Sequence, residues 1–401
     1  MRISSNTIFD NNVANLGAQQ ARLVQTQQQI ASGRRLLTAA SDPVAATRAL
    51  DVTQADAINT QQTANRGTAK DPLSISESTL ASVTLLLQDV RTAAVSAGNA
   101  TLTNADRATI GKNLNGRLQE LIGLANSTDG SGNALYAGFQ SKTTPFVASA
   151  AGVVSYQGDD GQRLVQAAPG RQIAANDSGA DVFMRIKDGN GTFATQAAAT
   201  NTGGGIIGAG SVLNPAALTG NNYSVSFAVA AGTTTYSVTN TTTGLPVAGM
   251  TAQPYTSGQS IAFDGLQFTM QGAPANGDTF TVKPSTNQSV FKTLSDLITT
   301  LSTPLSGANV SNGLASGITN VDNALGNVLN SRSSIGARLN EIDSLQASGD
   351  SIGVQLKQSL SALQDTDYNK AISDLNQQQT TLQAAQKSFA QVSNLSMFTY
   401  M

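Results

Sequence analysis

Neither cysteine nor histidine occurs in this 401-residue sequence, and these two absences remove several classes of functional site. Without them there is no Cys/His zinc site, no thiol nucleophile, no haem held by histidine and no Ser–His–Asp triad. Glutamate is nearly as scarce, since it stands only at Glu77, Glu120 and Glu341, each within a helical pattern. We therefore expect a protein that is not an enzyme, with no catalytic residues, no metal site and no cofactor.

Charged and aromatic residues are also few. Charged residues make up 12% of the chain and aromatic residues 5%, without tryptophan, and the net charge is −2. Nucleic-acid binding requires clustered Lys and Arg, and no such cluster occurs. No stretch approaches the roughly 18–20 apolar residues that span a bilayer, so we expect no membrane insertion. The N-terminus lacks the pattern of a secretory signal, which predicts a chain that is cytoplasmic or is secreted without a cleaved signal peptide.

One glycine pattern resembles a dinucleotide-binding loop but lacks the other features of that site. Gly203, Gly205 and Gly208 match the spacing of a dinucleotide-binding loop, but no strand pattern precedes them and no acidic residue follows before Asp264. Because that site needs a strand before the glycines and an acidic residue after them, we interpret this segment as a flexible loop.

Apolar residues at alternating spacings of four and three mark both ends of the chain. The N-terminal set is Phe9, Val13, Leu16, Leu23 and Ile30, with Gln20 and Gln27 in the two remaining positions of the pattern. The C-terminal set is Tyr368, Ile372, Leu375, Leu382 and Phe389, with Gln379 and Gln386 in the gaps. This spacing predicts a narrow apolar stripe on each helix, which another helix must cover. The glutamines weaken each stripe, so we predict a polymer subunit whose ends pack together on assembly.

These residues, together with Arg34 and Arg35, form the predicted assembly interface. A second interpretation is that the two stripes close an ordinary coiled coil within one chain. The two arginines pair with carboxylates of an adjacent subunit or are merely solvated, and the sequence leaves both alternatives open.

The pattern along the chain predicts an α+β fold: an elongated rod with helical coiled-coil termini, a helical bundle domain and an inserted antiparallel β domain at the far end. The expected divisions are residues 1–40 (N-terminal coiled-coil helix), 41–180 (first helical part, ending in a β-hairpin), 181–288 (β domain), 289–364 (second helical part) and 365–401 (C-terminal coiled-coil helix). The β domain is expected because Tyr223–Val229 and Thr235–Thr239 alternate polar and apolar residues, the period of half-buried strands.

Three local signals refine this division. Asp42 before Pro43 predicts a helix start, because a capping side chain precedes proline at the first helical position. Pro72 predicts a break or kink in the helix that follows, because proline lacks the amide donor and clashes with the preceding turn. Gly158–Gly161 is interpreted as a hairpin turn.

Several segments carry a family resemblance, and they occur in the same order as in that family. Residues 31–46 contain a Ser-Gly-basic turn followed by the capped helix start, with Asp-Pro-Val-Ala-Ala at 42–46. The others are Leu-Tyr-Ala-Gly-Phe-Gln at 135–140, Tyr-Gln-Gly-Asp at 156–159, Asn-Asp-Ser-Gly-Ala-Asp-Val-Phe-Met at 176–184 and Ile-Gly-Ala-Arg-Leu-Asn at 335–340. Together they resemble the flagellin superfamily, and the wording at 42–46 resembles its bacterial hook-associated protein 3 branch. The resemblance covers about residues 1–185 and 289–401.

This resemblance implies a structural adaptor at the flagellar hook–filament junction. Members are exported unfolded through the flagellar type III channel and form a ring with copies of themselves, between hook-associated protein 1 and the first layer of flagellin. A cytoplasmic export chaperone is expected on the C-terminal helix. The alternatives are flagellin itself, the bulk filament subunit, and an adhesin built on the uncharged β domain, for which Tyr223, Tyr236 and Tyr255 are the available aromatic residues.

Overall fold

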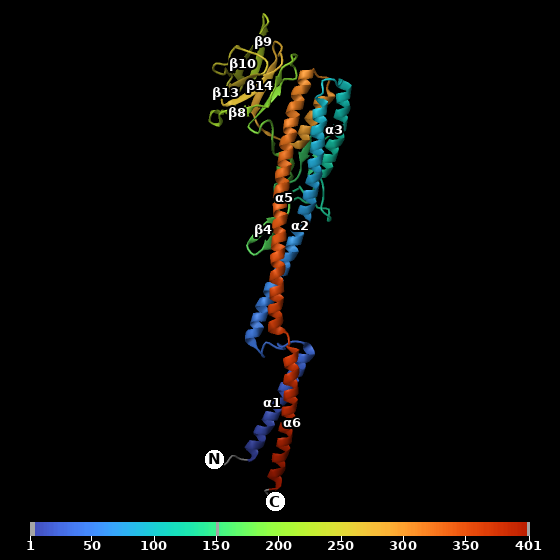
Figure 1. Ribbon diagram of the computed structural model, residues 1–401, viewed down its shortest axis with the longest axis vertical. Coiled ribbons are helices and arrows are strands. Elements are labelled where there is room, and N and C mark those ends of the chain that lie inside the picture. The colour runs from blue at the N-terminus through green and yellow to red at the C-terminus, as the bar shows by residue number, and fades with distance from the viewer. Residues whose placement is uncertain (1–4, 150–151, 399–401) are drawn as a thin grey trace. The chain divides into compact units, whose positions relative to one another are not determined.

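The computed structural model describes residues 5–149 and 152–398 and has the predicted α+β composition, with helical terminal regions around an antiparallel β domain (Figure 1). The α-helices are α1 (Ser5–Ser32), α2 (Pro43–Ala97), α3 (Asn104–Ala125), α4 (Val290–Ser302), α5 (Gly307–Gln364) and α6 (Tyr368–Phe398). A short π-helix, η1 (Ala180–Met184), and a 3₁₀ turn, η2 (Pro215–Ala217), flank and interrupt the strands.

The strands form antiparallel pairs before and within the β domain. Those before it are β1 (Phe146–Ala148), β2 (Val154–Tyr156), β3 (Leu164–Ala168) and β4 (Arg171–Ala174). Those from Ile186 onward are β5 (Ile186–Lys187), β6 (Phe193–Ala197), β7 (Ile206–Ile207), β8 (Ser211–Val212), β9 (Tyr223–Ala230), β10 (Thr233–Asn240), β11 (Leu245–Pro246), β12 (Gln253–Pro254), β13 (Gln259–Phe263), β14 (Leu266–Gln271), β15 (Thr279–Pro284) and β16 (Asn287–Gln288).

The chain divides into two compact units. The first, the terminal unit, consists of Met1–Ala64 and Ser344–Met401, and the second, the central unit, of Asn65–Asp343. Helices α2 and α5 contribute residues to both. The elongated arrangement and the domain boundaries expected from the sequence stay predictions.

A continuous α2 contradicts the predicted break at Pro72. The helix runs from Pro43 to Ala97, although a proline in a helix interior removes one backbone hydrogen bond. Packing on both sides of the proline accounts for this: Ala69 and Leu73 are fully buried, and the backbone carbonyl of Ser76 accepts a hydrogen bond from the Tyr136 hydroxyl at 3.3 Å. The helix start was predicted correctly, since Asp42 Oδ1 accepts the Ala45 amide at 3.0 Å.

The β domain of the central unit has its own apolar core between two sheets. One sheet has the strand order β11-β10-β9-β15-β6 and the other β13-β14-β7, with β12 and β8 paired alongside. Tyr223, Val225, Phe268 and Phe280 are fully buried between them. The predicted strands at 223–229 and 235–239 pair with each other as the β9–β10 hairpin, so this prediction is confirmed.

The signature segments around residues 135–140, 156–159 and 176–179 converge on one hydrogen-bonded cluster. The Tyr156 hydroxyl lies 2.9 Å from the carbonyl oxygen of Tyr136 and 2.8 Å from that of Asp159. The Asp159 carboxylate accepts the amides of Phe139 and Gly161, each at 2.8 Å. Gly158–Gly161 therefore follows β2 as a packed loop and does not join two paired strands, because β2 pairs with β1 and β3 with β4. The hairpin-turn interpretation of this segment is wrong.

The β3–β4 hairpin is fixed to α5 by charge pairs. Arg171 forms a two-pronged ion pair with Glu341, and Arg338 bonds Asp177 at 2.5 Å, just after β4. Hydrogen bonding from Arg171 lowers the pKa of Glu341 below its ordinary value.

Candidate assembly interface

Helices α1 and α6 of the terminal unit lie side by side and run antiparallel (Figure 1). At one end of the pair the rings of Phe9 and Phe389 have centroids 5.2 Å apart. At the other end the Thr366 amide donates to the Gly33 carbonyl at 2.9 Å. The two sets of residues predicted at opposite ends of the sequence are therefore brought together within one chain, as the coiled-coil interpretation requires.

The seam between α1 and α6 uses only part of each predicted stripe. Leu16, Leu23 and Ile30 on α1 and Leu375, Leu382 and Phe389 on α6 are half-buried. Val13 and Ile372 lie on the outer flank and remain 47% and 49% exposed. Phe9 and Tyr368, near the starts of their helices, are each 51% exposed. Pairing inside the chain thus leaves much apolar surface uncovered, and the assembly role of these residues stays a prediction.

The glutamines predicted to interrupt the stripes lie elsewhere. Gln20, Gln27, Gln379 and Gln386 are all exposed on the outer flank. The inward positions are taken instead by residues one place earlier in the sequence: Gln19, Thr26, Gln378 and Ala385. The seam keeps a heptad repeat, but from Leu16 and from Leu375 the inward positions step by three and then four residues, where the prediction stepped by four and then three.

The seam itself is polar and loosely packed. The Oε1 atoms of Gln19 and Gln378 are buried without a hydrogen-bond partner, and a cavity of about 280 Å³ lies beside Leu16 and Phe389. Each buried acceptor without a partner costs about 1–3 kcal/mol. Such a seam holds the two helices together only weakly.

The connection between α1 and α2 is held against the start of α6. Gly33 has a φ of +69°, a left-handed conformation suited to closing a helix, and an added Cβ would lie 3.1 Å from the Tyr368 hydroxyl. The Arg35 amide donates to the Gln364 carbonyl at 2.7 Å. The Arg35 guanidinium donates to the Leu363 carbonyl at 2.8 Å and lies 3.4 Å from Asp42. Arg35 therefore has partners within its own chain, which neither interpretation from the sequence considered. Both Arg34 and Arg35 are exposed.

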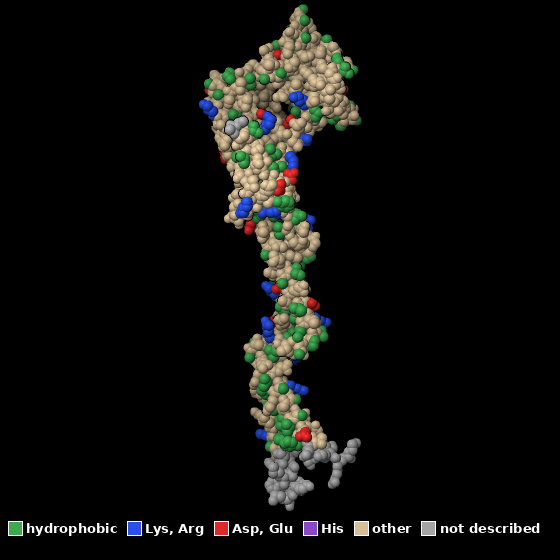
Figure 2. Space-filling view, turned by 180° about the vertical axis from the view of Figure 1, so that it is seen from behind, with side chains coloured by type: hydrophobic (Ala, Val, Ile, Leu, Met, Phe, Trp, Pro, Cys, Tyr) green, Lys and Arg blue, Asp and Glu red, His purple; other side chains and the backbone are tan. Residues whose placement is uncertain are grey.

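The terminal unit has almost no large buried apolar side chains. Among its described residues, the buried apolar side chains are the alanines Ala45, Ala49 and Ala371. Large side chains are exposed instead, including some that the sequence analysis missed: Val24, Val44, Leu50, Ile58, Ile352 and Val354. Their positions within long helical patterns could have identified them in the sequence as candidate interface residues. On the face shown in Figure 2, hydrophobic side chains lie over the terminal helices, with Lys, Arg and acidic side chains between them.

No helix among the described residues is long and apolar enough to cross a membrane. The same residues hold no cluster of acidic side chains suited to a metal ion.

Three family models match the chain. The bacterial flagellin N-terminal helical region matches residues 3–141, and the bacterial flagellin C-terminal helical region matches residues 318–401. The D2-like domain of flagellar hook-associated protein 1 matches residues 196–284, which lie in the β domain that the sequence analysis left without a relative.

Individual relatives agree with these matches. Flagellar hook-associated protein 3 of Salmonella typhimurium is 26% identical over 403 residues, covering 99% of each chain. The flagellar junction protein FlgL of Legionella pneumophila is 30% identical, with a TM-score of 0.72 over 79% of this chain and 100% of the relative. FlgL of Xanthomonas campestris is 32% identical, with a TM-score of 0.71 over 77% of this chain and 99% of the relative. The chain therefore belongs to the hook-associated protein 3 (FlgL) family of bacterial flagellar proteins.

Proposed function

We propose that this chain is a structural adaptor subunit at the hook–filament junction of the bacterial flagellum. The observation that carries the proposal is the apolar outer flank of the terminal helices, where Val13, Val24 and Ile372 remain about half exposed. An apolar flank of this kind needs a further helix to cover it. Three partners supply those helices: other copies of the chain in a ring, hook-associated protein 1 on one side of the ring, and flagellin on the other side. The ring seeds flagellin polymerisation and carries out no chemistry.

The route to that position is part of the same proposal. The chain leaves the cytoplasm through the flagellar type III system without a cleaved signal peptide, and a cytoplasmic chaperone holds the C-terminal helix before export. The weak α1–α6 seam supports this, because a terminal unit without large buried side chains opens readily. Its final location is extracellular, at the junction.

Immunoelectron microscopy tests the location. Antibody raised against residues 190–263, the uncharged part of the β domain, is applied to intact flagella. A single band where hook meets filament is the expected result. Label along the whole filament would make the chain flagellin, the alternative, and absence of label from flagella with an accessible epitope would favour the adhesin.

A further inference from the structure

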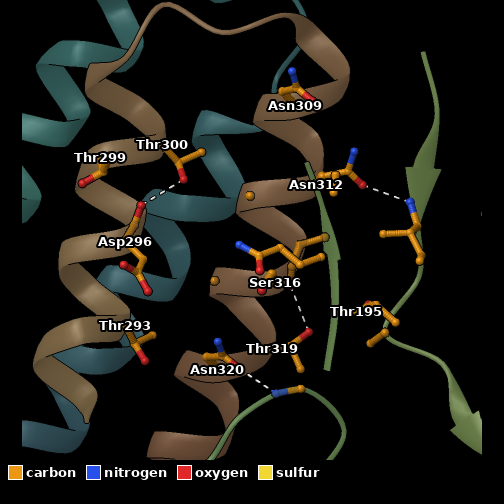
Figure 3. Close-up of a pocket in the computed structure, with 18 of the residues that line it drawn as sticks. Thr195, Thr293, Asp296, Thr299, Thr300, Asn309, Asn312, Ser316, Thr319 and Asn320 are labelled. Carbon is orange, nitrogen blue, oxygen red and sulfur yellow. Dashed lines mark hydrogen bonds between the residues drawn. The ribbon is translucent and has the colours of Figure 1, made fainter. Parts of the chain in front are cut away.

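One face of α5 carries a row of asparagines that contact the start of the β domain. These five residues, here called the asparagine ladder, are Asn309, Asn312, Asn320, Asn323 and Asn327. At about 100° per residue they fall within an arc of about 80° on the helix. All lie in the central unit, and Figure 3 shows Asn312 reaching from the helix to a strand and Asn320 reaching to a loop.

Every hydrogen bond from the ladder to the β domain and its entry goes to the main chain. Asn309 Nδ2 donates to the Asn201 carbonyl at 2.9 Å. Asn320 Oδ1 accepts the Gly189 amide at 3.0 Å, and Asn323 Nδ2 donates to the carbonyls of Lys187 and Gly189 at 2.9 and 2.8 Å. Asn327 Nδ2 donates to the carbonyls of Asp181 and Val182 at 2.8 and 2.9 Å.

Asn312 takes the place of a neighbouring strand. Its Oδ1 accepts the Ile207 amide and its Nδ2 donates to the Gly205 carbonyl, both at 2.9 Å (Figure 3). These two groups lie on the edge of β7 that faces away from β14, since Gly208, one residue on, donates its amide to Thr269 of β14. An unpaired edge is a template for adding another strand. The side-chain amide of Asn312, itself buried, fills that edge with a peptide-like group.

Two of the contacted residues are glycines whose positions leave no room for a side chain. Gly189 has a φ of +58°, and a Cβ there would lie 2.3 Å from the Phe193 carbonyl oxygen. At Gly205 a Cβ would lie 2.9 Å from the Met270 methyl group. The interpretation of Gly203, Gly205 and Gly208 as a flexible loop is therefore wrong. Ile206–Ile207 is a strand, and Gly205 is needed for close packing.

The remaining surface between helix and β domain is incompletely filled. A cavity of about 390 Å³ lies there, lined by polar residues such as Thr195 and Ser316 and by apolar residues such as Ile207 and Leu305. The β domain closes its apolar core between its own sheets, around residues such as Val225 and Phe268. An interface that is incompletely filled permits relative motion unless specific contacts prevent it.

We propose that the asparagine ladder is a docking device that fixes the orientation of the β domain on α5 by pairing with main-chain groups alone. The β domain is otherwise a separately packed body, so the ladder sets its position and not its fold. Because main-chain groups are the same in any sequence, the hydrogen bonds of the ladder do not depend on which side chains the contacted residues carry, provided that Gly189 and Gly205 keep their backbone conformation. This inference does not depend on the proposed function.

The test uses the absence of native cysteine. Cysteines placed at the exposed positions Thr243 and Ser333 carry spin labels, and the distance distribution between them is measured by double electron–electron resonance. A narrow distribution is expected for the parent chain. The triple variant Asn312→Ala, Asn320→Ala, Asn323→Ala is expected to broaden it at least twofold.

Two controls separate docking from other effects. Asn330→Ala changes an exposed asparagine of the same helix, and Lys187→Ala removes a side chain while keeping the carbonyl that Asn323 binds; both are expected to leave the distribution narrow. Hydrogen exchange at Val225 and Phe268 is expected to stay unchanged in the triple variant. A narrow distribution in that variant, broadening by Lys187→Ala, or a joint loss of protection at Val225 and Phe268 would each overturn the proposal. The single variant Asn312→Ala provides the same readout if the triple variant does not fold.

Discussion

Polar replacement of the outer flank separates assembly from folding. The variant Val13→Gln, Val24→Gln, Ile372→Gln changes three side chains that are 47%, 48% and 49% exposed. It leaves the seam residues Leu16 and Leu375 in place. Glutamine is a good helix former and already occurs on this flank at Gln20, so the helices themselves should form as before.

The magnitude follows from the surface that stays uncovered. Burying a whole Val or Ile side chain contributes about 1.5–3 kcal/mol. Since about half of each side chain is still exposed in the free chain, assembly gains roughly half of that value at each position. Three positions together give about 2–4 kcal/mol, which corresponds to roughly a hundredfold weaker association.

The assay measures addition of the purified chain to isolated hooks that end in hook-associated protein 1. Bound chain is pelleted with the hooks over a range of concentrations, and far-UV circular dichroism of the free chain checks folding. The expected result is a midpoint shifted upward by roughly a hundredfold with an unchanged spectrum. A matched control replaces three exposed leucines of the central unit, Leu164, Leu213 and Leu245, by glutamine. The reasoning is refuted if the flank variant binds like the parent chain, or if the control weakens binding equally.

Three further predictions concern the same two units. Deleting residues 1–30 or 368–401 should leave the thermal transition of the central unit intact and abolish addition of the chain to hooks. Calorimetry measures the transition and the pelleting assay measures addition. A shortened chain that still adds to hooks would contradict the prediction. Gly33→Ala should destabilise the terminal helices by about 1–2 kcal/mol, because alanine is strained at φ +69°, seen as an earlier loss of helical signal on heating than in Gly17→Ala, a helical site with free space. Hydrogen bonding from Arg171 lowers the pKa of Glu341 in the folded chain. The ionised carboxylate therefore stabilises the folded chain at pH values above its unfolded-state pKa, and this stabilisation is lost as the pH falls through the folded-state pKa. The stability difference between the parent chain and Glu341→Gln, at most about 1 kcal/mol for a partly exposed pair, should therefore shrink on acidification in denaturant titrations, and a constant difference would contradict this.

The local backbone conformation could be predicted wherever residues within one turn or one strand determine it. Asp42 before Pro43 marked the start of α2 because the cap and the proline act within a single turn. The alternation at 223–229 marked β9 because one face of that strand is buried and the other is not. At Pro72 the same kind of reasoning failed, because burial of Leu73 and the Tyr136–Ser76 contact outweigh the missing hydrogen bond.

The interface residues were predictable as a set but not in their phase. Leu16, Leu23, Leu375 and Leu382 belong to the seam under either order of the three- and four-residue steps, whereas Val13 belongs to it only under the predicted order. The asparagine ladder was missed for a different reason. Its spacing along α5 is visible in the sequence, but asparagine on a helix face is ordinarily solvated, and only the position of the β domain shows what it binds.

The two units differ in the size of the apolar side chains that they bury on folding. The central unit buries large side chains such as Tyr136, Phe183 and Phe268 and places side-chain amides against a strand edge that would otherwise accept another chain. The terminal unit buries alanines and leaves valine and isoleucine at the surface. Both units expose large apolar side chains, including Leu164 and Leu213 in the central unit, but among the described residues only the terminal unit lacks large buried ones. We therefore expect association to use the terminal helices, because a partner there also supplies the buried apolar contacts that the free unit lacks. If assembly contacts are concentrated in helices that lack a core of large side chains, we expect ordering of those helices and addition to a neighbour to occur as one step.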